Sequence, residues 1–201
     1  WLIARRDTSL HFPSDDPRHG IPAGNDAPTT TSYRDAEPMH WFPSAAESYR
    51  AFTELGRVWA TVGKATGRSD VSAHGAELLK LAPILYHDLH ASLNRTVNTT
   101  ASPGHRCWQS EASAAAVPQG FRPYSEMFFS GALSSTQLAD IYASASGAAR
   151  CGTPRHLTVG SPGIGGATMS TSAVAGFGYG LLQADMIDEF LLHYFAISAH
   201  A

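Results

Sequence analysis

Apolar residues recur every three or four positions in several stretches of the chain, which is the pattern of an amphipathic helix. The two clearest stretches cover residues 49–62 and 71–93. A capping-box sequence, Ser44-Ala45-Ala46-Glu47, marks the start of the first stretch. Only a short Gly-Arg-Ser turn separates the two, so we expect helices over 44–63 and 70–96 that pack as an antiparallel hairpin.

Two further helices are predicted downstream. Ser134, followed three residues later by Gln137, has the spacing of a helix cap and precedes the apolar residues Leu138 and Ile141. The stretch 181–195 carries an apolar stripe wide enough for a deeply buried helix.

Most other segments have the composition of loops, although residues 1–6 have the pattern of a helix end. Residues 10–43 contain six prolines, which exclude a helix or a central strand across the segment. Residues 97–123 form a second long loop, and the Gly-rich stretch 147–180 is expected to be loop with one strand at 156–159. We therefore predict a mainly α fold in which long loops join helical hairpins.

Both ends of the sequence have the pattern expected of positions inside a longer protein. The chain starts at Trp1 without a Met, and it stops at Ala201 directly after a helical pattern that has no cap. We expect residues 1–201 to be a single helical segment of a larger domain, with the remainder of that chain as its partner. A natural N-terminus left by processing is the alternative.

Charge and hydropathy exclude two classes of partner. Charged residues make up 15% of the chain, the net charge is −3, and the longest basic run is Arg5-Arg6. These values predict no surface for nucleic acid. No apolar run approaches the roughly 18 residues of a membrane-spanning helix, so no membrane partner is expected either.

Cysteines and sequons indicate a secreted, extracellular protein. Cys107 and Cys151 lie in loop-like sequence. A disulfide between them would close about 45 residues and add roughly 4 kcal/mol of stability. Asn94-Arg95-Thr96 and Asn98-Thr99-Thr100 are N-glycosylation sequons. We expect the bridge to form and Asn94 and Asn98 to be glycosylation sites, although cysteines can stay free and sequons arise by chance.

The loop 10–43 carries the densest polar chemistry. Arg18, His19, Asp26 and Asp35 lie among Pro and Gly residues, and Trp41 follows them. Glycoside hydrolysis uses one acid to protonate the leaving oxygen and another to activate water or attack, and aromatic rings stack on the sugar. The aspartates also suit a second role, as turn formers that cap local backbone groups.

A second candidate acid, Glu126, lies in aromatic sequence two residues after Tyr124. Desolvation there would raise the pKa of its carboxyl group, as a general acid requires. The alternative is a structural glutamate that pairs with Arg122 or caps a helix.

Neither a metal nor another cofactor is expected. His87 and His90 are spaced i, i+3, whereas the HExxH zinc motif needs i, i+4. The sequence also lacks the Gly-Lys-Ser/Thr ending of a phosphate loop and the Gly-x-Ser-x-Gly elbow of a serine hydrolase.

The segment Pro17-Arg18-His19-Gly20-Ile21-Pro22-Ala23-Gly24-Asn25-Asp26 resembles a cleft-lining loop of secreted six-hairpin glycosidase-like proteins. Residues 124–133 and 178–183 are similar to loops between the hairpins of that superfamily. The resemblance implies part of an (α/α)6 toroid that binds a carbohydrate in its cleft. It also implies acid/base roles for Asp26 and Glu126, with Arg18, His19, Trp41 and Tyr124 as substrate contacts.

Two alternatives to a glycoside hydrolase stay open. The hairpins are compatible with a non-catalytic, secreted carbohydrate-binding or structural module. A polysaccharide lyase shares the toroid and needs a Tyr or His base, for which His19, His40, Tyr33 and Tyr124 are available.

Overall fold

The computed structural model describes residues 2–24, 39–109, 111–112, 122–145, 151 and 171–200. This part of the chain is mainly α, with seven helices and no strand beyond isolated bridges, as predicted. The helices are α1 (Leu2–Ser9), α2 (Phe42–Thr66), α3 (Ser69–Thr96), α4 (Arg122–Phe129), α5 (Ser135–Ala145), α6 (Thr171–Gln183) and α7 (Ile187–His200).

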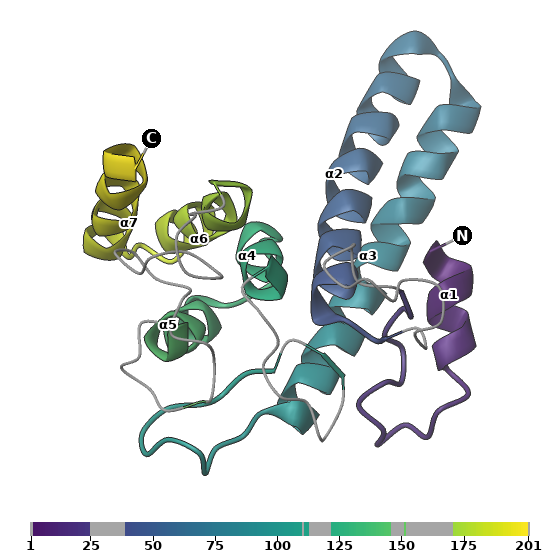
Figure 1. Ribbon diagram of the computed structural model, residues 1–201. Helices are drawn as coiled ribbons and strands as arrows, with labels where there is room; N and C mark the ends of the chain where they lie inside the picture. The colour runs from purple at the N-terminus through teal and green to yellow at the C-terminus, as the bar shows by residue number, and fades with distance from the viewer. Residues whose placement is uncertain are drawn as a thin grey trace, which may run out of the picture.

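Helices α2 and α3 form a long hairpin that extends beyond the other helices (Figure 1). Gly67 ends α2 in the left-handed conformation, at φ 69°, which glycine adopts without a steric penalty. The backbone N–H of Arg68 donates to the carbonyl of Gly63 at 2.9 Å and closes the turn. The predicted hairpin is therefore confirmed.

Small residues make the contact between the two helices. A Cβ atom on Gly63 would lie 2.4 Å from the backbone nitrogen of Ser72, and one on Gly75 would lie 2.4 Å from that of Ala60. The larger apolar residues of this part of α2 stay 40–54% exposed, namely Leu55, Val58, Trp59 and Val62. The apolar pattern thus predicted the position of α2 in the sequence, whereas its glycines form the face that contacts α3.

The main core lies where the base of the hairpin meets α4 and α6. Helix α6 approaches α4 closely, because a Cβ on Gly176 would lie 2.0 Å from the carbonyl oxygen of Ser125 and one on Gly180 2.4 Å from the ring of Phe128. The largest buried side chains of this core are Ile21, Phe42, Leu89, Leu93, Trp108, Tyr124, Met127, Phe128, Ile141, Phe177 and Leu181.

One predicted helix cap is confirmed and one is wrong. The hydroxyl of Ser134 accepts from the backbone N–H of Gln137 at 3.3 Å, and the Gln137 side chain accepts from the N–H of Ser134 at 2.9 Å. Helix α2 instead begins at Phe42, before the predicted box at Ser44, and its N-cap residue Trp41 makes no side-chain cap bond. Pro43 occupies the first turn, where its missing N–H is no loss.

The predicted helix over 181–195 is two helices. The helical conformation is interrupted between α6 and α7 at Asp185, which has a positive φ of 59°. Deep burial of the whole stripe is wrong as well, because Leu182, Leu192 and Phe195 are 45–63% exposed. Helix α6 also begins inside the stretch expected to be loop, and the strand predicted at 156–159 lies outside the described residues.

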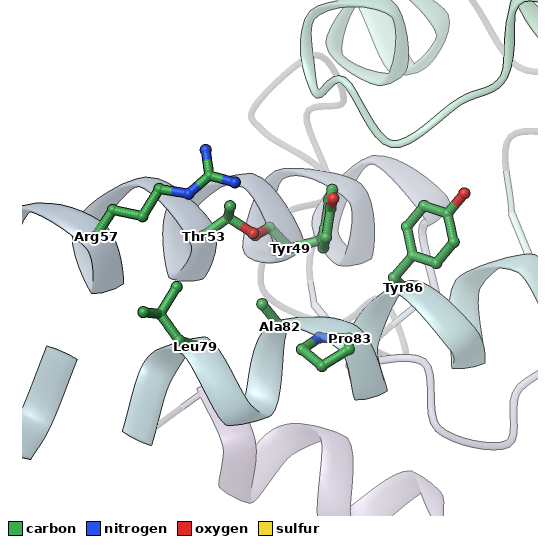
Figure 2. Close-up of a pocket in the computed structure, with 7 residues that line it drawn as sticks. All are labelled: Tyr49, Thr53, Arg57, Leu79, Ala82, Pro83 and Tyr86. Carbon is green, nitrogen blue, oxygen red and sulfur yellow. The ribbon is translucent and has the colours of Figure 1, made fainter. Parts of the chain in front are cut away.

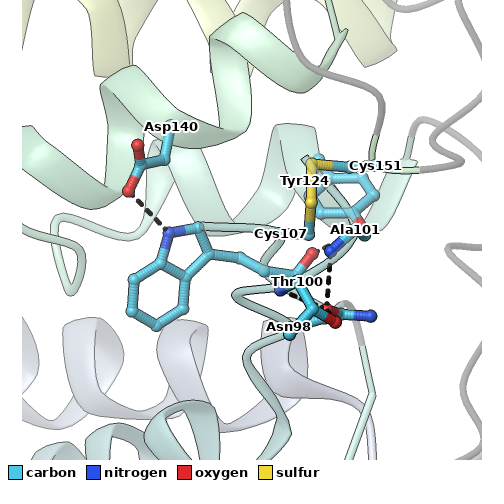
Figure 3. Close-up of a disulfide and its surroundings, with 8 residues drawn as sticks. Asn98, Thr100, Ala101, Cys107, Tyr124, Asp140 and Cys151 are labelled. Atoms are coloured by element: carbon cyan, nitrogen blue, oxygen red, sulfur yellow. Dashed lines mark hydrogen bonds between the residues drawn. A yellow bond between two sulfur atoms is a disulfide. The ribbon is translucent and has the colours of Figure 1, made fainter. Parts of the chain in front are cut away.

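Short pairings and one disulfide hold the loops. Gly24 and Met39 exchange two backbone hydrogen bonds of 2.9 Å, as do Asn98 and Cys107 at 3.0 and 2.8 Å. The predicted bridge between Cys107 and Cys151 is present, with Cα atoms 5.2 Å apart (Figure 3). Among the helices described, none is long and apolar enough to span a bilayer.

Candidate functional site

Helix α1 lies beside α3, and the segment that follows α1 also contacts α3 (Figure 1). The guanidinium of Arg6 donates to Asp88 at 2.7 Å, with both side chains largely buried. Gly20, at φ 77°, lies so close to Asp88 that a Cβ atom would be 2.6 Å from its carboxyl group. Ser92 donates to the backbone carbonyl of Pro17. These contacts fix the position of the loop that carries Arg18 and His19.

Phe12 is the centre of a polar cluster within this loop. The Arg18 guanidinium lies 3.9 Å from the centroid of the Phe12 ring, and the His40 ring meets it edge-on at 5.3 Å. The ring of His19 is 2.7 Å from the Phe12 carbonyl. A carbonyl only accepts, so Nδ1 of His19 carries the proton. The structure therefore brings Arg18, His19 and His40 together around one residue, Phe12.

Arg18 and Asp16 form a bidentate ion pair at the edge of the cluster. Its two bonds measure 3.0 Å from Nε to Oδ1 and 2.7 Å from Nη2 to Oδ2. The hydrogen bonds from Arg18 lower the pKa of the Asp16 carboxyl to about 2, and the same pairing raises the pKa of Arg18. Asp16 is therefore ionised at neutral pH and neutralises much of the charge on Arg18.

His40 is a half-buried histidine with one ring nitrogen in a hydrogen bond. Burial lowers its pKa below the usual 6.5, so the ring is neutral at neutral pH. Nδ1 donates to the carbonyl of Ile21 at 2.7 Å, which leaves Nε2 as the acceptor. This nitrogen is a chemically suitable base.

Trp41 pairs with a carboxylate that sequence reasoning missed. Trp41 and Glu111 form an antiparallel bridge, and the N–H of Ala112 donates to the carbonyl of His40 at 2.8 Å. Residues opposite each other in such a bridge project to the same face, with Cβ atoms about 5 Å apart. Only 6% of Trp41 and 9% of Glu111 are exposed. Burial raises the pKa of the Glu111 carboxyl group.

Three buried polar atoms on Trp41 and on the segment that contains Glu111 lack a hydrogen-bond partner within the described structure. They are Nε1 of Trp41, Oε1 of Gln109 and Oε2 of Glu111. Gln109 lies two positions before Glu111 in the sequence. One donor and two acceptors match the hydrogen-bonding capacity of a water molecule, which can accept from the indole and donate twice.

The other predicted site residues have different outcomes. Asp26 and Asp35 lie outside the described residues, so their roles, and the pairing of Asp26 with Glu126, stay predictions. Glu126 is partly buried on α4. Tyr124 lies in the core, where its hydroxyl donates to the carbonyl of Trp108 at 3.1 Å, and its role as a substrate contact also stays a prediction. Asn94 and Asn98 are both exposed.

A separate groove lies between the two helices of the hairpin (Figure 2). It has a volume of about 310 Å³. Tyr49 and Tyr86 line it with ring centroids 5.1 Å apart, and Arg57 extends along the same side. Thr53, Leu79, Ala82 and Pro83 complete the lining. The tyrosine rings and the guanidinium, at opposite ends of the groove, offer stacking and hydrogen-bonding groups that suit a sugar.

Among the described residues, no three His, Cys, Asp or Glu side chains are grouped so that they could hold a metal ion. Comparison with known proteins finds no matching family model, no similar curated protein and no similar solved structure.

Proposed function

We propose that this chain is part of a secreted carbohydrate-active enzyme, a glycoside hydrolase, with its saccharide site beside the Trp41–Glu111 bridge. The observation that carries the proposal is the set of three buried, unpartnered polar atoms on Trp41, Gln109 and Glu111. Each such atom costs about 1–3 kcal/mol when it is left unsatisfied. A sugar hydroxyl would satisfy them when Glu111 is protonated, because it would then accept from Trp41 and Glu111 and donate to Gln109.

Glu111 is the candidate general acid. An acid catalyst must hold its proton near neutral pH, and burial shifts the pKa of Glu111 in that direction. Glycoside hydrolysis needs a second carboxylate as base or nucleophile. Asp26 and Glu126 are the candidates for it, and Arg18 and His19 would contact the substrate from the adjoining cluster.

An (α/α)6 toroid is the architecture we propose for the complete domain. Its repeating unit is a helical hairpin, and the α2–α3 helical hairpin supports the proposal. The exposed apolar side chains of α7, such as Leu192 and Phe195, support a further helical layer supplied by the remainder of the protein. The Cys107–Cys151 bridge supports secretion.

The test is a glycan-array and hydrolysis screen on the full-length protein, followed by single variants. Glu111→Gln should lower turnover by 10²-fold or more, whereas Asp70→Asn, at the exposed tip of the hairpin, should leave it unchanged. Trp41→Ala should mainly weaken binding. Full activity in Glu111→Gln would remove that residue from the mechanism, and loss of activity in Asp26→Asn or Glu126→Gln would then identify the acid.

A non-catalytic carbohydrate-binding module is the second candidate, and the groove of Figure 2 favours it. In that case Tyr86→Ala should abolish glycan binding, Glu111→Gln should not, and no hydrolysis should be seen. A polysaccharide lyase, with His40 as the base, would be recognised by an unsaturated sugar product.

A further inference from the structure

The two sequons of the chain have different local structures. Asn94 lies in the last turn of α3, and the Thr96 of its sequon is only 8% exposed. The Thr96 hydroxyl donates to the carbonyls of Ser92 and Leu93, both at 3.2 Å. The hydroxyl that an N-glycosylation sequon requires is therefore directed into the helix.

Asn98 lies just past α3 in a turn of its own. Its side-chain oxygen accepts three hydrogen bonds, from the N–H of Thr100 at 2.9 Å, the hydroxyl of Thr100 at 3.0 Å and the N–H of Ala101 at 3.0 Å. The bonds converge on this one oxygen (Figure 3). Asn98, Thr100 and Ala101 are all exposed, and the sequon hydroxyl of Thr100 is bonded to the Asn98 side chain.

The backbone of Asn98 is fixed by its neighbours. Its N–H and C=O groups bond to Cys107 at 3.0 and 2.8 Å, and Cys107 is bonded to Cys151. The turn is therefore a stable, exposed element of the folded protein and needs no unfolding to present its asparagine.

We propose that Asn98 is the N-glycosylation site of this chain and that Asn94 stays unmodified. In the transfer, the amide nitrogen of Asn98 bonds to the anomeric carbon of an oligosaccharide. The carbon–oxygen bond to the polyisoprenyl diphosphate donor breaks, the lipid diphosphate leaves, and the nitrogen loses one proton. The proposal needs secretion and does not depend on the carbohydrate-active function.

Both local structures can form early enough to direct the transfer. The turn at Asn98 and the last turn of α3 involve hydrogen bonds between residues no more than four positions apart. Helical segments form in about a microsecond, whereas synthesis adds only about 5–20 residues per second. The hydrogen bonds that distinguish the two sequons can therefore form while the chain is still being made.

Secretion of the full chain from eukaryotic cells provides the test. Glycans are removed in heavy-oxygen water with an amidase that converts each glycosylated Asn to labelled Asp, and the peptides are then mapped by mass spectrometry. We expect the label at Asn98 and an unlabelled Asn94. Label at Asn94, or a secreted protein without label at either position, would overturn the proposal.

Matched variants test the role of each hydroxyl. Thr100→Ala should abolish the glycan, Thr100→Ser should retain it, and Thr96→Ala should leave the glycan mass unchanged because Asn94 carries none. A glycan that persists in Thr100→Ala would refute Asn98 as the site. Since the wild-type peptide map is decisive, poor folding of a variant leaves the result intact.

Discussion

Replacing Gly75 by Ala tests whether small residues hold the α2–α3 hairpin together. Gly75 faces the backbone of α2, and an added Cβ would lie 2.4 Å from the nitrogen of Ala60, 2.7 Å from the carbonyl oxygen of Gly56 and 2.9 Å from the carbonyl carbon of Trp59. All three obstructing atoms belong to the main chain. No rotamer change can relieve the overlap, so the helices must move apart.

The expected loss of stability follows from two opposing effects. Alanine is favoured over glycine inside a helix by about 1 kcal/mol. Overpacking costs about 1–3 kcal/mol, and an overlap with backbone belongs at the upper end of that range. We therefore expect Gly75→Ala to lower the free energy of unfolding by about 2 kcal/mol, which reduces the folding equilibrium constant roughly 30-fold.

Urea unfolding followed by circular dichroism measures this change, and Gly178→Ala is the matched control. A Cβ on Gly178 in α6 would make ordinary contacts of 3.6 Å with His193 and Phe190, so this variant should gain about 0.5–1 kcal/mol. If Gly75→Ala is as stable as the wild type or more stable while the control behaves as expected, close backbone packing does not hold the hairpin.

Three further measurements probe the site and the disulfide. Burial raises the pKa of Glu111 above its usual 4.5, so the folded state holds its proton more tightly and loses stability as the pH rises through the folded-state pKa. As the pH rises through this pKa, the Glu111→Gln variant should therefore become more stable relative to the wild type. If the stabilities of the two proteins change with pH in parallel, the carboxyl group of Glu111 is not buried. By NMR, Asp16 should titrate with a pKa of about 2, and Arg18→Gln should return it toward 3.8; no shift would exclude the ion pair. Denatured, unreduced protein should show no free thiol, and replacing both Cys107 and Cys151 by Ala should cost about 4 kcal/mol, because the bridge spans 44 residues.

Sequence patterns predicted helix caps and turns better than they predicted which segments contact one another. The cap at Ser134 and the Gly-Arg-Ser turn after α2 depend on hydrogen bonds within a few residues, and both were predicted from the sequence. The break at Asp185 was missed because the apolar spacing continues across it. Periodicity reports which residues share a helix face and is insensitive to a single left-handed residue.

The candidate site could be predicted only in part. Arg18 and His19 were selected as a polar cluster in one loop, and the structure groups them around Phe12. Glu111 was not predicted as a site residue, because nothing in its neighbouring sequence indicates that it is buried or that it lies opposite Trp41. Asn94 and Asn98 match the same motif, and only the environments of Thr96 and Thr100 distinguish them.

The sequence by itself determined the mainly α class, the hairpin and the cysteine pair, because each follows from short-range hydrogen bonding or from residue type. The tertiary structure alone decided that glycines form the α2–α3 contact and that Trp41 lies opposite Glu111. These features depend on which surfaces meet when segments far apart in the sequence pack together. The distance between the α2 and α3 backbones and the burial of Trp41 and Glu111 arise from this packing, and no local sequence pattern encodes them.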